Sequence, residues 1–331
     1  MIAVIPVAGV GTQLRPHTYT QPKSLIPVAG KPILSYIIDQ LLEVGITEFV
    51  FVIGYLGEKI KEYVDSEYPK INKSFVFQEQ REGLGHAIWL TKEVIPNDSS
   101  IIIVLGDTIL DANLKEFIKI KNSALGVKRV DNPSLFGVAQ LNDKSEIIQV
   151  VEKPKIPKSN MALVGLYKIN EYGLLIEALE EIIKKKKKVN NEYLLTDGIM
   201  TIIKKGNKVD AFKVDNWYDC GQKEVLLQTN ALLLKNKKGN TKNNKLLKNT
   251  IIIEPVVIGK NAVVENSIIG PNITIGENSV IKESILKDSI IGSYTNLSGI
   301  VLQHSLVGND TVIKGSAQSL NIGDNTALDL R

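Results

Sequence analysis

Cysteine is nearly absent from this sequence, which has Cys220 alone among 331 residues. One cysteine cannot form an internal disulfide, and no Cys/His cluster has the spacing of a zinc site. Small domains stabilised by disulfides or by zinc are therefore excluded. Long hydrophobic runs are also missing: the apolar run at 101–105 is far shorter than the ~20 residues of a membrane span. The N-terminus lacks the charged segment of a secretion signal. We expect a cytoplasmic protein with no membrane partner.

Arginine is scarce too, at four of the 40 basic residues, and 36 acidic residues leave a net charge of +4. This balance gives little support for a nucleic-acid partner, and we expect none. The lysine run at 184–188 follows an amphipathic stretch, and such a run more often solvates a helix end than forms a binding patch.

The length suggests two domains, since a domain has about 100–200 residues. Hydrophobic residues make up 44% of the chain and charged residues 23%. These values are typical of globular proteins and exclude a disordered chain or a fibrous rod.

Short aliphatic runs alternate with amphipathic segments over the first 220 residues, a pattern typical of a parallel sheet covered by helices. We expect strands at 2–7, 49–54, 74–80 and 101–107, separated by helices at 33–45, 58–68 and 85–95. Strands of mixed direction are expected at 124–130, 136–141, 147–151 and 163–168, and helices at 171–184, 191–204 and 222–235. The pattern predicts an α/β, Rossmann-like domain over 1–235, with a mixed, mainly parallel sheet.

The spacing changes after a Lys-, Asn- and Gly-rich segment at 236–250, which we expect to be a linker. Beyond it an aliphatic residue recurs every five or six positions, often followed by glycine. No α-helix gives this spacing, but it is typical of the hexapeptide repeats of a parallel β-helix. The alternative, a β-sandwich, needs strands longer than two or three residues between turns. We predict a β-helix of nearly four coils over 251–331.

A glycine-rich turn follows the first expected strand, and its backbone N–H groups could hold phosphates. A dinucleotide-binding fingerprint would need a third glycine where Leu14 stands, and a Walker A loop would need a Gly-Lys-Ser/Thr sequence that is absent. The loop therefore belongs to neither of these common phosphate-binding motifs.

The same segment resembles the signature of sugar-1-phosphate nucleotidyltransferases, since it reads GVGTQLRPHT, then Pro22-Lys23, then Lys31-Pro32. Further motifs follow in the order of that family: QREGLGHA (80–87), VLGD (104–107), FGVAQ (136–140), VVEKP (150–154), LVGLY (163–167), NEYLLTD (191–197) and WYDCG (217–221). The repeats are similar to the left-handed β-helix appended to many members. SLNIGD (319–324) is similar to the tail of long glucose-1-phosphate thymidylyltransferase-like members. The resemblance covers the whole chain.

Two aspartates are candidate metal ligands. Asp107 follows an aliphatic strand, at the edge where α/β sheets bind ligands, and Asp219 ends a second strand-like segment. Either residue alone would be explained as a helix cap or a turn residue. Together they offer the hard oxygen ligands that Mg²⁺ prefers, and the resemblance implies that they hold Mg²⁺ against the substrate phosphates.

The resemblance also implies roles for other residues. Lys23 contacts the α-phosphate or pyrophosphate, and Lys153 contacts the sugar phosphate. The loop residues Ala8, Gly9, Gly11, Thr12 and Gln13 bind the nucleotide, with Gln80 and Gly83 at the pyrimidine edge. The sugar phosphate is bound by Gly137, Glu152, Lys153, Gly165, Tyr167 and Glu192.

One position departs from the family pattern, because Gln13 stands where the family usually has an arginine on the triphosphate. Glutamine lacks the charge and the bidentate fork of arginine, and we expect Arg15 to substitute. The loss of a charged hydrogen bond, worth about 1.5–3 kcal/mol, would weaken catalysis without abolishing it. It also leaves open a weakly catalytic regulatory paralogue.

The sequence thus predicts a Mg²⁺-dependent enzyme that joins a sugar 1-phosphate to a nucleoside triphosphate (NTP). Glucose 1-phosphate with dTTP or UTP is the leading pair, and mannose 1-phosphate with GTP is an alternative. A bifunctional enzyme whose β-helix acetylates a sugar also stays open, with His304 as its thin support. We expect a homo-oligomer, because a stacked β-helix offers surfaces for self-association.

Overall fold

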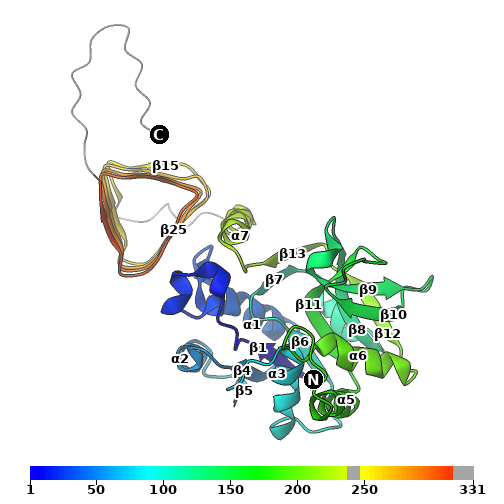
Figure 1. Ribbon diagram of the computed structural model, residues 1–331. Coiled ribbons are helices and arrows are strands. Elements are labelled where there is room, and N and C mark those ends of the chain that lie inside the picture. The colour runs from blue at the N-terminus through cyan, green and yellow to red at the C-terminus, as the bar shows by residue number, and fades with distance from the viewer. Residues whose placement is uncertain (237–246, 316–331) are drawn as a thin grey trace. The chain divides into compact units, whose positions relative to one another are not determined.

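The structure is a computed structural model that describes residues 1–236 and 247–315. Its contacts divide the chain into two compact units. The first consists of Met1–Pro27 and Lys31–Leu226, and the second of Val28–Gly30 and the described residues from Leu227 onward (Figure 1). Most of the expected linker and the SLNIGD motif lie outside the described residues.

A nine-stranded sheet forms the centre of the first unit, in the order β10-β9-β11-β6-β1-β4-β5, with β8 and β12 joined through β11. The strands are β1 (Ile2–Pro6), β4 (Glu48–Ile53), β5 (Asn72–Phe77), β6 (Ile101–Val104), β8 (Ser123–Arg129), β9 (Gly137–Leu141), β10 (Ile147–Glu152), β11 (Met161–Ile169) and β12 (Val209–Lys213). β1, β4, β5 and β6 are parallel, whereas β11 runs antiparallel to β6. The expected α/β fold with a mixed sheet is confirmed.

The helices of this unit are α1 (Ile33–Glu43), α2 (Gly57–Glu67), α3 (Leu84–Leu90), α4 (Leu114–Lys119), α5 (Tyr172–Lys184) and α6 (Leu195–Lys204). α1 forms because its apolar residues recur at helical spacing, and Ile33, Ile37 and Leu41 are buried. α6 begins four residues later than expected. Asn190 and Asn191 have φ values of 51° and 66°, which a helix cannot continue. None of the described helices is long and apolar enough to cross a membrane.

A small two-stranded sheet holds one of the candidate metal ligands. β7 (Thr108–Asp111) pairs antiparallel with β13 (Asn216–Asp219), so that Asp219 lies opposite Thr108. This pairing places Asp219 beside the turn after β6 that carries Asp107, although 112 positions separate the two aspartates in the sequence. Sequence periodicity did not reveal β7, because the strand follows β6 after a short turn and its apolar residues merge with those of β6.

The second unit contains α7 (Lys223–Asn236), whose first residues belong to the first unit, and a parallel β-helix. Its strands are β14 (Leu247–Lys248), β15 (Ile251–Ile252), β16 (Val256–Ile258), β17 (Val263–Glu265), β18 (Ile268–Ile269), β19 (Ile273–Ile275), β20 (Val280–Lys282), β21 (Ile285–Lys287), β22 (Ile290–Ile291), β23 (Asn296–Ser298), β24 (Val301–Gln303), β25 (Leu306–Val307) and β26 (Val312–Lys314). They stack in three parallel sheets, β14-β17-β20-β23-β26, β15-β18-β21-β24 and β16-β19-β22-β25.

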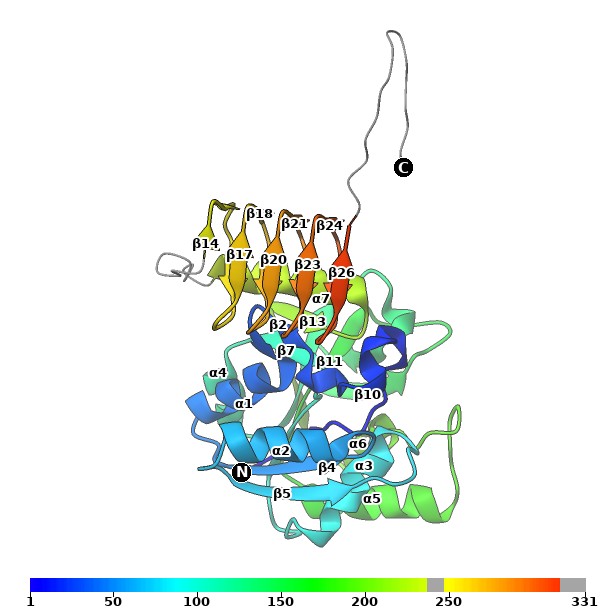
Figure 2. The same ribbon diagram turned by 90° about the vertical axis from the view of Figure 1, so that its left-hand side faces the viewer.

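The coils of the β-helix bury the residues that the repeat spacing predicted. Ile269, Ile281, Leu286 and Leu297 are fully buried in its core, and Figures 1 and 2 show the triangular coil from its end and its stacked strands from the side. The predicted parallel β-helix is confirmed, and the arrangement is consistent with the left-handed form. β14 lies within the segment expected to be linker, because Leu247 continues the stack opposite Val264.

Candidate active site

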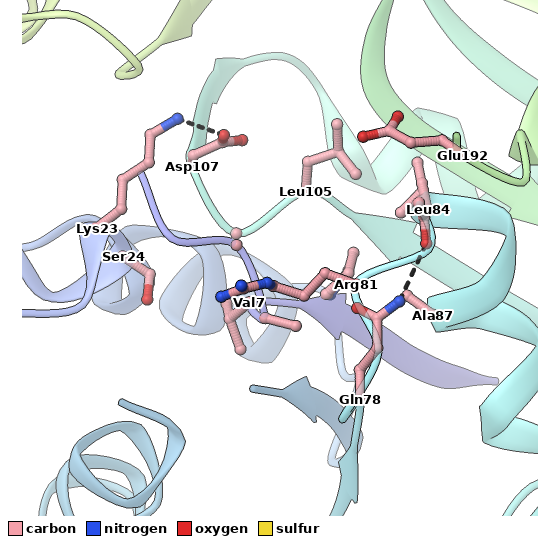
Figure 3. A pocket seen from close by; sticks show the side chains of 15 residues that line it. Val7, Lys23, Ser24, Gln78, Arg81, Leu84, Ala87, Leu105, Asp107 and Glu192 are labelled. Atoms are coloured by element: carbon pink, nitrogen blue, oxygen red, sulfur yellow. Dashed lines mark hydrogen bonds and ion pairs between the residues drawn. The ribbon is translucent and has the colours of Figure 1, made fainter. Parts of the chain in front are cut away.

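A cavity of about 410 Å³, here called the Lys23 cavity, opens at the carboxyl ends of the parallel strands. Its walls come from the end of β1 and the residues after it (Pro6–Gly9), from four residues after β5 (Gln78, Arg81, Gly83 and Leu84), from the residues after β6 (Leu105–Asp107), and from Lys23, Ser24, Ala87 and Glu192. The strand order reverses between β1 and β6, and α/β sheets bind ligands at such a switch point. Figure 3 shows the side chains that line this cavity.

A second cavity of about 240 Å³, the Glu152 cavity, shares Leu84, Leu105, Asp107 and Glu192 with the first. All six residues that the resemblance assigned to the sugar phosphate line it: Gly137, Glu152, Lys153, Gly165, Tyr167 and Glu192. Asp219 and Trp217 also contribute to its wall. Two adjoining cavities that meet at Asp107 suit two substrates whose reacting groups must touch.

Lys23 is held between the two candidate metal ligands. Its Nζ lies 2.5 Å from Oδ2 of Asp107 and 3.8 Å from Oδ1 of Asp219. Burial raises the pKa of Asp219, and the neighbouring charge of Asp107 raises it further, while Lys23 opposes both effects. The single positive charge of Lys23 therefore does not neutralise both carboxylates, and the remaining negative charge favours the binding of a further cation.

The donor set fits a magnesium ion shared with substrate. In the described part of the chain no group of three or more His, Cys, Asp or Glu side chains gathers as a metal cage. Mg²⁺ is commonly bound by one or two carboxylates, with waters and substrate phosphates completing its octahedron. The paired oxygens of Asp107 and Asp219 match that mode of binding.

Two residues of the Glu152 cavity are in unusual states. Burial raises the pKa of Glu152, and the carboxylates of Glu192 and Asp197 raise it further, although Lys153 lowers it. Lys153 adopts φ 38°, a left-handed backbone conformation that costs a residue other than glycine about 1–3 kcal/mol. Its N–H donates to the carbonyl of Phe136 at 3.0 Å, which helps to hold this conformation.

Two residues that line this cavity carry polar atoms without partners. Oγ1 of Thr196 and Nε1 of Trp217 are buried and have no hydrogen-bond partner among the described residues. Buried polar groups are nearly always paired, so these two atoms are candidate contacts for a polar ligand. The Trp217 ring packs edge-on against Phe136, with 4.8 Å between ring centroids, and forms an aromatic wall.

Gln78, rather than Gln80, reaches the Lys23 cavity from the loop after β5. Gln80 is exposed and lies outside the lining of both cavities, whereas Gln78 is 5% exposed and lines the first. Nε2 of Gln78 donates to the carbonyl of Gly83 at 3.1 Å and lies 3.2 Å from Nδ1 of His86. The alternation of buried and exposed residues along β5 could have indicated Gln78, because Gln78 lies two positions after the buried Val76 and therefore on the same face.

Gly83 and Gly165 allow close approaches at the cavity walls. Gly83 has φ 97°, and a Cβ there would lie 2.7 Å from Cβ of Glu192. Gly165 has φ 78°, and a Cβ there would lie 2.9 Å from the Leu105 side chain. Any other residue would be strained at both positions and would narrow the cavities.

The structure distributes the predicted loop residues over several places. Ala8 and Gly9 line the Lys23 cavity, while Gly11 and Thr12 do not. Gly11 packs on Lys23, since a Cβ there would lie 3.0 Å from Cβ of Lys23. Gln13 lines a third hollow, which shares Lys153, Trp217 and Asp219 with the Glu152 cavity.

Arg15 lies outside the lining of both cavities. Its guanidinium stacks on the ring of Tyr19, 5.0 Å from the ring centroid. The expectation that Arg15 replaces an arginine at position 13 therefore finds no geometric support. Sequence analysis missed Arg81 and Ser24, which do line the Lys23 cavity. Arg81 lies within the QREGLGHA motif and Ser24 directly follows Lys23, but the resemblance implied no role for either.

The fold and the paired cavities are those of a nucleotide-dependent transferase. The family model described as "Nucleotidyl transferase" matches residues 2–236, and the chain belongs to this family.

Its relatives confirm the resemblance to sugar-1-phosphate nucleotidyltransferases. The chain is 37% identical over 259 residues to "Bifunctional protein GlmU" of Methanocaldococcus jannaschii, a match that covers 77% of this chain and 60% of the relative. It is 34% identical over 224 residues to "UTP--glucose-1-phosphate uridylyltransferase AglF" of Haloferax volcanii, covering 66% of this chain and 89% of the relative. The crystal structure of UDP-glucose pyrophosphorylase complexed with UDP-glucose matches with a TM-score of 0.63 and 28% identity, over 71% of this chain and 99% of that one.

Proposed function

We propose that this protein transfers a nucleotidyl group from an NTP to a sugar 1-phosphate, releasing pyrophosphate. The observation that carries the proposal is the position of Lys23 between Asp107 and Asp219, where the Lys23 cavity adjoins the Glu152 cavity. The nucleotide fits the first cavity, because the glycine-rich loop exposes N–H groups there. The sugar phosphate fits the second, because Glu152 and Glu192 can accept hydrogen bonds from its hydroxyl groups.

The chemistry needs no covalent enzyme intermediate. An oxygen of the sugar phosphate attacks the α-phosphorus in line, a new P–O bond forms, and the bond to the β-phosphate oxygen breaks as pyrophosphate leaves with the electron pair. The residues of the site act mainly by positioning two anionic groups and by stabilising the charge that crowds at the α-phosphate. Lys23 and Lys153 supply positive charge on the two sides.

Asp107 and Asp219 would hold Mg²⁺, which supplies Lewis-acid stabilisation of the phosphate oxygens when bound. Lys23 keeps the two carboxylates oriented toward one another, because its ammonium contacts both. This arrangement makes Lys23 a partner of the metal site as well as of the phosphates.

UTP or dTTP is the favoured nucleotide, and glucose 1-phosphate the favoured sugar. Because Nε2 of Gln78 is directed at the carbonyl of Gly83, its amide oxygen faces the cavity (Figure 3). An acceptor at this position suits the N3–H of uracil or thymine and disfavours the unprotonated N3 of cytosine. The names of AglF and of UDP-glucose pyrophosphorylase support uridine and glucose.

GTP with mannose 1-phosphate remains the alternative, because guanine also carries a ring N–H donor. Pyrophosphate release from dTTP, UTP, GTP, CTP and ATP, each with glucose, mannose, galactose and N-acetylglucosamine 1-phosphates, decides between them. The proposal predicts release with uracil or thymine nucleotides and glucose 1-phosphate. Release confined to GTP and mannose 1-phosphate would favour the alternative, and no release with any pair would favour a regulatory paralogue.

Self-association through the β-helix is supported by an apolar row on one outer face. Ile251, Ile268, Ile285 and Val301 are aligned across β15, β18, β21 and β24. Val301 is 73% exposed and Ile251 60% exposed, and an exposed aliphatic row of this kind marks an interaction surface. We expect a homo-oligomer that Ile285→Glu dissociates, as measured by light scattering after size exclusion. A wild-type monomer at micromolar concentration would contradict it.

A further inference from the structure

The Lys23 cavity has few positive charges for a nucleotide that carries several negative ones. Its charged lining residues are Lys23, Arg81, Asp107 and Glu192, so its charges cancel. Lys23 is moreover engaged by Asp107 and Asp219. Beyond the Mg²⁺ that Asp107 and Asp219 would hold, a cation that is not already paired within the protein would favour a triphosphate in this cavity.

Arg81 is a cation of this kind. It is exposed and lines the cavity, and no hydrogen bond, ion pair or ring contact holds it among the described residues. Figure 3 shows its side chain extending from the loop after β5 toward Val7, with the guanidinium on the side of the cavity where Ser24 lies. The other described arginines are elsewhere: Arg15 stacks on Tyr19, and Arg129 ends β8.

Ser24 provides a second, independent indication of a ligand on that side. Its side chain lines the cavity and is 4% exposed, yet its hydroxyl has no hydrogen-bond partner among the described residues. A buried hydroxyl without a partner costs stability, so an anionic acceptor that completes its hydrogen bonding would be favoured there. Ser24 follows Lys23 directly in the chain and shares its short 3-10 turn, Lys23–Leu25.

We propose that Arg81 and Ser24 bind the outer phosphates of the nucleoside triphosphate. The guanidinium donates two N–H groups to phosphate oxygens in the bidentate geometry that arginine favours, and Ser24 donates its hydroxyl. The inference rests on the proposed function. It gives Arg81 a role that belongs to the triphosphate tail and leaves recognition of the base to Gln78.

The test measures binding of a phosphate series by calorimetry, in the full-length protein without sugar phosphate. The series is the triphosphate, diphosphate, monophosphate and free nucleoside of the NTP that binds wild type most tightly. Arg81→Gln is compared with Arg81→Lys, and Arg129→Gln is the matched control because that arginine lies outside both cavities. Thermal unfolding checks that each variant is folded.

Arg81→Gln should weaken triphosphate binding about 10- to 100-fold, as the loss of a charge-assisted hydrogen bond does. The loss should shrink along the series and vanish for the nucleoside, and Arg81→Lys should fall between. Ser24→Ala should weaken triphosphate binding several-fold while leaving the melting temperature without nucleotide unchanged or higher. Unaltered triphosphate binding by Arg81→Gln, or an equal loss for the nucleoside, would overturn the inference while the proposed function stands. A wild type that binds no NTP would overturn both.

Discussion

Nζ of Lys23 lies 2.5 Å from Oδ2 of Asp107, although 84 positions separate the two residues in the sequence. The contact joins the glycine-rich segment after β1 to the turn after β6. Both segments leave the carboxyl ends of neighbouring parallel strands, so the sheet itself brings them together. The pair stands where the two cavities adjoin, and the account of the reaction depends on it.

Replacement of Lys23 should separate catalysis from substrate binding. Lys23→Gln removes the charge that stabilises the crowded phosphates, and kcat should fall about 100- to 1,000-fold, as when one preorganised donor is lost. Lys31→Gln is the matched control, since Lys31 pairs with Asp39 away from both cavities. Steady-state pyrophosphate release measures kcat for both variants. A Lys23→Gln enzyme with wild-type kcat would remove Lys23 from the mechanism.

Removal of the metal should stop the reaction, and acid should weaken metal binding. Chelation by EDTA should abolish pyrophosphate release, and excess Mg²⁺ should restore it. Because burial and Asp107 raise the pKa of Asp219, its carboxyl protonates at a higher pH than an ordinary aspartate, and protons then compete with Mg²⁺. The apparent Mg²⁺ affinity should fall as the pH is lowered, and Asp219→Asn should weaken it at every pH. Full activity in EDTA would contradict the assignment of both aspartates.

Glu152 should make sugar-phosphate binding sensitive to pH. Its pKa is raised by burial, so lowering the pH protonates it earlier than an exposed glutamate and removes a hydrogen-bond acceptor. The KM for sugar 1-phosphate should rise as the pH falls through the raised pKa, while Glu152→Gln should have a high KM that varies less with pH. A wild-type KM that is flat over this range would contradict the role.

The raised pKa of Glu152 should also make the stability of the fold depend on pH. A carboxyl whose pKa is raised in the folded state stabilises the fold most when protonated, and this contribution is lost as the pH rises through the folded pKa. Glu152→Gln should therefore be more stable than wild type at pH 8, and the difference should vanish in acid. Thermal unfolding at several pH values measures it.

Replacement of Lys153 by glycine should stabilise the fold and weaken the binding of sugar 1-phosphate. Lys153 and Lys186 are both exposed, with φ 38° and 51°, and glycine adopts such values without strain. Lys153→Gly should raise the unfolding free energy by up to about 1 kcal/mol and increase the KM for sugar 1-phosphate. Lys186→Gly should bring a similar gain in stability with unchanged kinetics, because it lies outside both cavities.

Comparison of the two glycine variants separates the effect of the backbone conformation on stability from the effect of the Lys153 side chain on substrate binding. If both variants kept wild-type kinetics, Lys153 would have no part in the binding of the sugar phosphate. If Lys153→Gly were less stable than wild type, the contacts of the Lys153 side chain would contribute more to stability than its backbone strain costs.

The sequence predicted the fold most accurately where the hydrophobic period is strong. Ile281 and Leu286 lie in the β-helix core as their five-residue separation indicated. The strands that escaped prediction, such as β7 and β12, have too few residues for a period to emerge and are fixed by pairing with distant segments.

The candidate site was predictable to the extent that its residues lie in motifs. Glu152, Lys153 and Glu192 line one cavity as expected. Gln78 and Arg81 were missed because β5 is followed by five polar residues in succession, Gln78–Glu82. The period-2 alternation of β5 indicates Gln78, whereas only the three-dimensional course of the loop brings Arg81 to the cavity. The role expected of Arg15 rested on its charge, but its side chain stacks on Tyr19 and lies outside the lining of both cavities.

The most direct test of the central claim compares pyrophosphate release by wild type and by Asp107→Asn, with Mg²⁺, UTP and glucose 1-phosphate. Asp143→Asn serves as the control, because Asp143 is exposed and lies outside both cavities. We predict release by wild type and by the control, with formation of the nucleotide sugar, and a loss of at least about 100-fold in Asp107→Asn. Equal release by wild type and Asp107→Asn would contradict the site at the Lys23–Asp107 pair.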